Sequence, residues 1–319
     1  MTKYERVMKV LKGENVDFIP TGFWLHFPKE TLESVDKTIT AHMEFLKETD
    51  TDLFKVMNEN EFRISEKINS AVDWKKITVY EKNDKKIVTQ KELLKRILEI
   101  NSKNTVVLGT VHGLIACLSH QSGISYSNSY KLMNEHFKNN KNEIEYALDK
   151  TVESIINMAE ETFDAGVDGI YYAALGGEKT KFSDEIFEEF IKPRELEIFK
   201  VLKRKNKLNV LHICKENTEL KRYIDYDFDI VNWAVNDGGY SLLEGCNLFK
   251  DKTILGGFDD RSGILVDGTI DEIKGYTDEL IETMKGHKFI IGADCTLPTE
   301  ISYQRIKEVV NQSKNNLYK

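Results

Sequence analysis

Eight short apolar runs alternate with amphipathic helical stretches along the chain, and this alternation restricts the fold more than any other feature. The runs are FIPTGFW (18–24), DLFKVMNE (52–59), TVVLGTV (105–111), GIYYAAL (169–175), LNVLHIC (208–214), IVNWAV (230–235), TILGGF (253–258) and FIIGADC (289–295). Each run is nearly continuous in apolar residues, as expected for parallel strands that are buried on both faces. Eight such strand–helix units in 319 residues predict one (β/α)8 TIM barrel, a single domain over residues 1–319.

An open, doubly wound sheet is the main alternative to the barrel. Such a sheet would need a phosphate-binding loop after its first strand, and neither G-x-G-x-x-G nor G-x-x-x-x-G-K-[ST] occurs in the sequence. The stretch between the second and third runs, residues 60–104, is unusually long. Its segment ITVYEKNDKKIVT (77–89) looks like a β-hairpin with Asn83-Asp84 in the turn. We expect this insertion to lie outside the barrel proper, as a lid or an interaction surface.

Composition narrows the classes of partner and the compartment. The chain has 45 basic and 53 acidic residues, a formal net charge of −8, which disfavours a nucleic acid as the main partner. No apolar stretch reaches the roughly 18 residues of a membrane span. The charged, helical start MTKYERVMKVLKGENVD differs from a secretory signal. A cytoplasmic protein is therefore expected, and its four cysteines should be reduced thiols.

The tripeptide His212-Ile213-Cys214 ends the fifth run, and Cys295 ends the eighth. Side chains alternate along a strand, so His212 and Cys214 point the same way. The carboxyl ends of TIM-barrel strands meet at one mouth, where active sites lie. One imidazole and two thiolates suit Zn²⁺, and three protein ligands leave a fourth position open, as in catalytic zinc sites. The alternative is a core histidine with inert buried cysteines, but three soft ligands at two strand ends favour the metal.

Other polar residues near the strand ends are weaker candidates for the same mouth. Those considered for substrate binding are Glu59, Tyr172 and Asn232. Glu59 could instead accept a hydrogen bond from His212, and Tyr172 and Asn232 could simply pack within the barrel. His112 is a rival metal-binding or acid–base residue. Asp294 either orients a zinc ligand or caps the next helix.

Several segments match one known family. The opening carries Arg6, Val7, Leu11, Gly13, Glu14, Val16, Asp17 and Pro20 in the spacing RV…L.GE.VD..P. The centre, AGVDGIYYAALGGEKTKFSDEIFEEFIKP (165–193), and the segments KTILGGFDDR (252–261) and FIIGADCTLPTEIS (289–302) also match. Together these segments resemble the uroporphyrinogen decarboxylase superfamily over nearly the whole length.

The resemblance implies a specific chemistry. Within the superfamily, H-x-C followed about 80 residues later by Cys is the zinc signature of the corrinoid methyltransferase branch, which includes methylcobamide:coenzyme M methyltransferases. By resemblance, His212, Cys214 and Cys295 would be the zinc ligands, and the zinc would hold a thiol substrate as thiolate. That thiolate would take a methyl group from methylcobamide, or the transfer would run in reverse. The superfamily also places Asp259 at the mouth as a substrate contact, whereas we expect its neighbour Asp260 to be exposed.

The resemblance also implies a protein partner, and two alternative functions have to be weighed against it. No cobalamin-binding D-x-H-x-x-G occurs in the chain, so we expect the cobalamin on a separate corrinoid protein; a homodimer is compatible with the superfamily. The porphyrinogen decarboxylases carry an R-Q-A-G-R segment after the first strand, whereas residues 24–28 here are WLHFP, without the arginines that match carboxylates. The decarboxylase is therefore the weaker reading. A non-catalytic module that binds a corrinoid partner is the other alternative.

Overall fold

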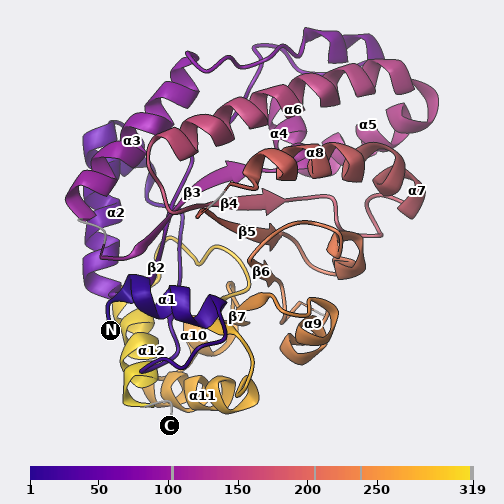
Figure 1. Cartoon of the computed structure of the whole chain (residues 1–319). Coiled ribbons are helices and arrows are strands. Elements are labelled where there is room, and N and C mark those ends of the chain that lie inside the picture. The colour runs from indigo at the N-terminus through magenta and orange to yellow at the C-terminus, as the bar shows by residue number, and fades with distance from the viewer. Residues whose placement is uncertain (102–103, 205, 238, 317–319) are drawn as a thin grey trace.

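Eight parallel strands form a closed barrel in strand order β1 to β8 in the computed structural model, with helices around the outside (Figure 1). The structure describes residues 1–101, 104–204, 206–237 and 239–316. The strands are β1 (Thr21–Gly22), β2 (Leu53–Val56), β3 (Val106–His112), β4 (Gly169–Ala174), β5 (Leu208–Ile213), β6 (Ile230–Trp233), β7 (Thr253–Phe258) and β8 (Phe289–Ala293). Each of the eight predicted runs coincides with one strand, β3 extending one residue past its run, so the predicted (β/α)8 TIM barrel is confirmed.

The helices follow the strands and pack on the outside of the barrel (Figure 1). The α-helices are α1 (Lys3–Leu11), α2 (Val35–Thr49), α3 (Lys85–Asn101), α4 (Leu114–Ser122), α5 (Tyr126–Asn139), α6 (Lys141–Asp164), α7 (Asp184–Ile186), α8 (Lys192–Leu202), α9 (Leu242–Leu248), α10 (Gly263–Asp267), α11 (Ile270–Thr283) and α12 (Tyr303–Asn315). Shorter turns are η1 (Lys29–Leu32), η2 (Ala71–Lys76), η3 (Phe187–Ile191) and η4 (Leu220–Tyr223). None of the described helices combines the length and the apolar character needed to cross a bilayer.

The predicted hairpin at residues 77–89 is wrong. The chain turns at residues 82–83 but then enters α3, the crossover helix between β2 and β3, rather than a second strand. The apolar side chains of α3, among them Ile87, Leu94 and Ile97, are buried and recur at helical spacing. Much of the predicted insertion 60–104 therefore belongs to the barrel proper, and only the part before α3 is additional; residues 102–103 lie outside the described chain.

The additional segment before α3 covers the side of the barrel rather than extending from it. Trp74 in η2 is fully buried, and its indole N–H donates to His136 Nδ1 at 2.7 Å. The backbone N–H of Tyr80 donates to the Ser154 hydroxyl of α6. The segment is thus packed against α5 and α6.

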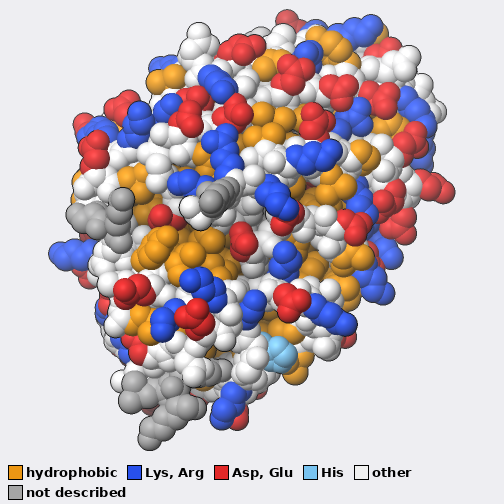
Figure 2. Space-filling view, in the orientation of Figure 1, with side chains coloured by type: hydrophobic (Ala, Val, Ile, Leu, Met, Phe, Trp, Pro, Cys, Tyr) orange, Lys and Arg blue, Asp and Glu red, His pale blue; other side chains and the backbone are white. Residues whose placement is uncertain are grey.

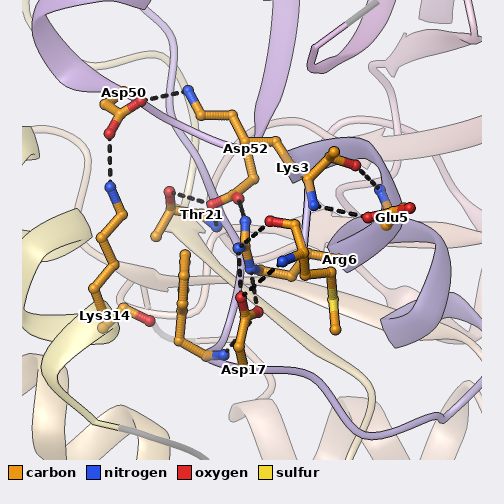
Figure 3. A network of polar contacts seen from close by, with 12 residues as sticks. Lys3, Glu5, Arg6, Asp17, Thr21, Asp50, Asp52 and Lys314 are labelled. Carbon is orange, nitrogen blue, oxygen red and sulfur yellow. Dashed lines mark hydrogen bonds and ion pairs between the residues drawn. The ribbon is translucent and has the colours of Figure 1, made fainter.

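A network of charged residues ties the first helix to the base of the barrel (Figure 3). The guanidinium of Arg6 in α1 donates to Asp17 at 2.7 Å and to the buried Asp52 at 2.5 Å. The other oxygen of Asp52 accepts hydrogen bonds from the backbone N–H and the hydroxyl of Thr21. Because β1 has only two residues in the ladder, these side-chain bonds help to hold it in the sheet beside β2.

Charge on the surface is mixed. On the face shown in Figure 2, the described basic and acidic side chains are interspersed, with apolar side chains between them. The excess of acidic residues that gives the net charge of −8 therefore does not gather into one field on this face.

Candidate metal centre

His212, Cys214 and Cys295 meet at the carboxyl-terminal mouth of the barrel. His212 lies in β5, Cys214 follows the last residue of that strand, and Cys295 lies two residues beyond β8. All three side chains line one cavity of about 740 Å³. Ile213, between the two β5 ligands, is fully buried and does not line it, as alternation along a strand requires. Within the described chain, this is the one cluster of three or more His, Cys or acidic side chains close enough to share a metal ion.

The spacing of the three ligand atoms fits a tetrahedral zinc ion. The two sulfurs lie 3.9 Å apart, and Cys295 Sγ lies 3.3 Å from His212 Nε2; all three atoms lie within 4.8 Å of one another. Zinc–sulfur and zinc–nitrogen bonds of normal length at tetrahedral angles place two sulfurs about 3.8 Å apart and a sulfur and a nitrogen about 3.5 Å apart. The separations of Cys295 Sγ from the other two donor atoms are therefore close to those that the metal would impose.

Asn232 fixes the orientation and the tautomer of His212. The amide nitrogen of Asn232 donates to the backbone carbonyls of Leu255, at 2.9 Å, and Ala293, at 3.0 Å. Its amide oxygen is therefore the atom that faces His212 Nδ1, at 2.6 Å, and Nδ1 must carry the proton. The lone pair of Nε2 is left free toward the two cysteines, as a metal ligand requires.

The thiols of Cys214 and Cys295 have pKa values that are shifted in opposite directions. The pKa of Cys214 is raised well above its ordinary value because its thiol donates to Cys295 and because it is buried. The same hydrogen bond, helped by His212, lowers the pKa of Cys295. Two thiolates this close repel each other, and a bound divalent cation would remove that repulsion.

Polar side chains from the segments that follow β1, β2 and β3 line the cavity beyond the three candidate ligands. Glu59 accepts a hydrogen bond from His26 Nδ1 at 2.7 Å, and both line the cavity. His120 Nε2 contacts the Tyr126 hydroxyl and lies 3.3 Å from Glu61. This wall of the cavity therefore carries several groups that can accept or donate protons.

Of the other predicted site residues, the structure places some on the lining of the cavity and others away from it. Glu59 lines the cavity but bonds His26, so it is not the predicted acceptor for His212; Asn232 takes that place. Asn232 itself is fully buried and does not line the cavity. His112 lines the cavity, and burial lowers its pKa to about 3. It is not part of the metal cluster.

Tyr172 and Asp259 do not reach the cavity, contrary to prediction. The hydroxyl of Tyr172 accepts from the Leu114 backbone and donates to Glu195 on α8, because alternation along β4 turns Tyr172 outward and gives the inward position to Tyr171. The carboxylate of Asp259 instead accepts from the backbone N–H groups of residues 261 and 262, which folds the loop before α10.

The neighbouring acids also differ from expectation. Asp260, expected to be exposed, is 2% exposed and lines the cavity, and burial raises its pKa to about 6. Asp294 directly precedes Cys295, and its carboxylate accepts hydrogen bonds from the backbone and side chain of Asn236. It therefore anchors the loop after β6 beside a zinc-ligand candidate.

Lys55 was missed by the sequence reasoning. It lies in the middle of β2 and lines the cavity while being 6% exposed. The sequence does mark this residue, because Lys55 is the single charged residue inside the otherwise apolar strand LFKV. A lysine is rarely buried without a partner or a function.

Comparison with known proteins gives one family and several similar folds. The sequence model described as "Uroporphyrinogen decarboxylase (URO-D)" matches residues 55–315. Among solved structures, a methyltransferase from Methanosarcina mazei is 18% identical, with a TM-score of 0.77 over 99% of each chain. A B12-independent methionine synthase from Shewanella sp. W3-18-1, in complex with selenomethionine, is 12% identical, with a TM-score of 0.56 over 94% of each chain. At these identities the two structures show the fold alone. No curated protein gives a significant match.

Proposed function

Because the chain belongs to the uroporphyrinogen decarboxylase family, we propose that it is a member that works as a zinc-dependent methyltransferase. It moves a methyl group between the cobalamin of a separate corrinoid protein and a thiol. The observation that carries this proposal is the set His212, Cys214 and Cys295, spaced for tetrahedral zinc and open to the cavity. The structural likeness to a methyltransferase from Methanosarcina mazei agrees with it.

The roles of the residues follow from their geometry. A zinc ion held by these three ligands supplies a positive charge that keeps a fourth, substrate sulfur in its thiolate form. Asn232 holds His212 so that Nε2 faces the site. The cavity has room for the substrate beside these three side chains, so that its sulfur would face the mouth, where a corrinoid protein would present its methyl group.

The overall reaction balances without an added oxidant or reductant. The thiol loses its proton to solvent, and its sulfur forms a bond to the methyl carbon. The carbon–cobalt bond breaks and its electron pair stays on cobalt, which goes from Co(III) to Co(I). The reverse transfer, from a thioether to Co(I), uses the same arrangement.

A porphyrinogen decarboxylase fits this cavity less well. The described lining carries four carboxylates, Glu59, Glu61, Asp260 and Glu300, against three cations, Lys55, Lys215 and Arg261. A substrate with many carboxylates needs an excess of cations. A non-catalytic binding module would also have little use for an open metal position with an oriented histidine.

The zinc content of the purified protein tests the proposal. We expect about one zinc per chain in the wild type and its loss in Cys214→Ala and Cys295→Ala, because two remaining ligands cannot hold the ion. Cys246→Ala is the matched control, since Cys246 is half-buried in α9, outside the cluster, and should keep the zinc. The zinc protein should then demethylate methylcobalamin when a thiol is added, which the cobalamin spectrum reports.

Two results would contradict the proposal. The first is a wild-type protein that holds no zinc even after reduction and reconstitution. The second is a zinc protein that leaves methylcobalamin unchanged with every thiol while releasing carbon dioxide from a carboxylated porphyrinogen, which would restore the decarboxylase.

A further inference from the structure

The sulfurs of Cys214 and Cys295 lie 3.9 Å apart, and both side chains line the cavity at the mouth of the barrel. Both cysteines are partly exposed, so a small solute that enters the cavity can reach them. They come from the ends of β5 and β8 and are 81 positions apart in the chain. The fold therefore brings together, at an accessible position, two thiols that are distant in the sequence.

The other two cysteines are placed differently. Cys117 is buried in α4, where its thiol points to the backbone carbonyl of His112. Cys246 is half-buried in α9, and burial raises its pKa to about 11. Neither contacts another sulfur in the described chain. Cys214 and Cys295 are thus the one pair of cysteines there that is placed to react together.

A disulfide between Cys214 and Cys295 needs only a short approach of the two sulfurs. A sulfur–sulfur bond is about 2.05 Å long, so the present separation of 3.9 Å has to shorten by about 2 Å. Both cysteines lie beyond the last residue of their strands. Rotation of the two side chains and a small shift of the segment after β8 can therefore supply the approach while the barrel stays closed.

We propose that Cys214 and Cys295 form a reversible disulfide when a peroxide enters the cavity, and that this disulfide switches the metal site off. The regulatory part rests on the proposed function, because zinc is the ion that would be lost. A thiolate is a zinc ligand, whereas a sulfur in a disulfide has no negative charge to offer the metal. His212 alone would remain of the three candidate ligands, and a single imidazole does not hold the ion.

The oxidation balances with hydrogen peroxide as the oxidant. One sulfur attacks a peroxide oxygen, the oxygen–oxygen bond breaks, and hydroxide leaves, which gives a sulfenic acid. The second sulfur then attacks the first as a thiolate, the sulfur–sulfur bond forms, and a second hydroxide leaves. The two sulfurs together lose two electrons, and the two peroxide oxygens gain them. A dithiol reverses the step by thiol–disulfide exchange and is itself oxidised to a disulfide.

Peroxide treatment of the zinc-loaded protein tests the proposal. Hydrogen peroxide is added in steps, and the released zinc, the free thiols and the mass of the intact chain are measured at each step. We expect zinc release to parallel the loss of about two thiols and about 2 Da per chain, and a digest to contain a peptide that joins residues 214 and 295. Dithiothreitol should then restore both thiols and, with zinc supplied, the bound metal.

Single-cysteine variants distinguish the disulfide from unspecific oxidation. In Cys214→Ala and in Cys295→Ala, the remaining sulfur at the site has no partner, so peroxide should add oxygen to it and raise the mass of the chain. Cys246→Ala is the matched control, because Cys246 lies outside the cluster. It should form the disulfide and release its zinc at the same peroxide concentration as the wild type.

The outcomes separate this inference from the proposed function. A wild type that never holds zinc contradicts the proposed function, while the thiol count and the mass still test the disulfide. Zinc and thiols that both survive an excess of peroxide overturn the inference alone. So does a wild type that gains oxygen instead of forming the disulfide, or a disulfide that involves Cys117 or Cys246. Zinc loss that dithiothreitol does not reverse would be damage rather than a switch and would also overturn it.

Discussion

At the scale of single residues, Asn232 links the candidate metal site to the barrel that carries it. It faces His212 through its oxygen and two strands, β7 and β8, through its nitrogen. Since Ala293 is two residues from Cys295, the same amide orients one ligand and holds the strand that leads to another. A residue outside the cavity therefore controls the geometry inside it.

We predict that Asn232→Ala lowers the zinc affinity about 10–100-fold, because His212 loses the acceptor that fixes its tautomer and ring orientation. Competition with a metal chelator measures the change. Asn209→Ala is the control, since Asn209 is also a buried asparagine, near the other end of β5, where its nitrogen bonds Leu202. Equal affinities in the two variants would show that His212 needs no such partner.

The sequence could predict that His212, Cys214 and Cys295 lie together, but not what surrounds them. Alternation along a strand puts His212 and Cys214 on one side whatever the strand's register, which is why that prediction needed little structure. Whether Tyr171 or Tyr172 faces inward depends on where β4 begins relative to its neighbours, and two adjacent tyrosines give no periodicity to decide it. The placement of Asp259 depends on loop hydrogen bonds that have no pattern in the sequence.

At the scale of elements, a buried carboxyl joins β4 to the helices behind it. Glu195 in α8 is fully buried and accepts hydrogen bonds from the hydroxyls of Tyr172, at 3.1 Å, and Tyr226, at 2.8 Å. Burial raises its pKa to about 7, although both hydrogen bonds oppose the rise. The folded state therefore favours the neutral acid.

This raised pKa makes stability depend on pH. Because the folded pKa, about 7, lies above the unfolded value, Glu195 stabilises the fold fully below about pH 4.5, and this contribution is lost as pH rises through 7. Glu195→Gln mimics the neutral acid. We predict that the difference in free energy of unfolding between this variant and the wild type changes by about 2 kcal/mol in favour of the variant as the pH is raised from 5 to 8. Urea unfolding at both pH values measures the gain, and a difference that does not change with pH would contradict it.

Strands and helices were predictable to different degrees. Each of the eight strands falls on a predicted run, and only β3 extends beyond its run, by one residue, because continuous apolar stretches bounded by polar loops are what a two-sided parallel sheet requires. The start of α3 was misread as a hairpin because its first turns combine Ile87, Val88 and Thr89 with an Asn-Asp turn. Those β-branched residues favour strands locally, and the helix forms because its apolar face packs against α2 and α6.

At the scale of the whole molecule, the first and the last helices, α1 and α12, meet at the base of the barrel. Asp50, after α2, pairs with Lys3 of α1 at 2.6 Å and with Lys314 of α12 at 2.6 Å (Figure 3). Arg6 and Asp52 form the buried part of this region. The base of the barrel, far from the cavity, therefore carries the interactions that close the fold.

We predict that Arg6→Met lowers the free energy of unfolding by about 3–5 kcal/mol, because it leaves Asp52 charged, buried and without its cation. The double variant Arg6→Met/Asp52→Asn should recover part of the loss, since no buried charge is left unpaired. Arg96→Met, which removes a surface ion pair with Asp36, should change little. Denaturant unfolding compares the three, and a double variant less stable than Arg6→Met would contradict this account.

The division of the cavity has a consequence for how such a protein can diversify. The candidate metal ligands lie at the ends of β5 and β8, whereas Lys55, Glu59 and Glu61 come from β2 and the loop after it. Under the proposed function, the β2 stretch therefore contributes to substrate recognition from a part of the gene separate from the metal ligands, together with residues 215 and 296–300 beside those ligands. Mutations in the β2 stretch can give relatives that accept different compounds while inheriting one unchanged reaction, and a protein engineer can randomise that stretch with the same expectation.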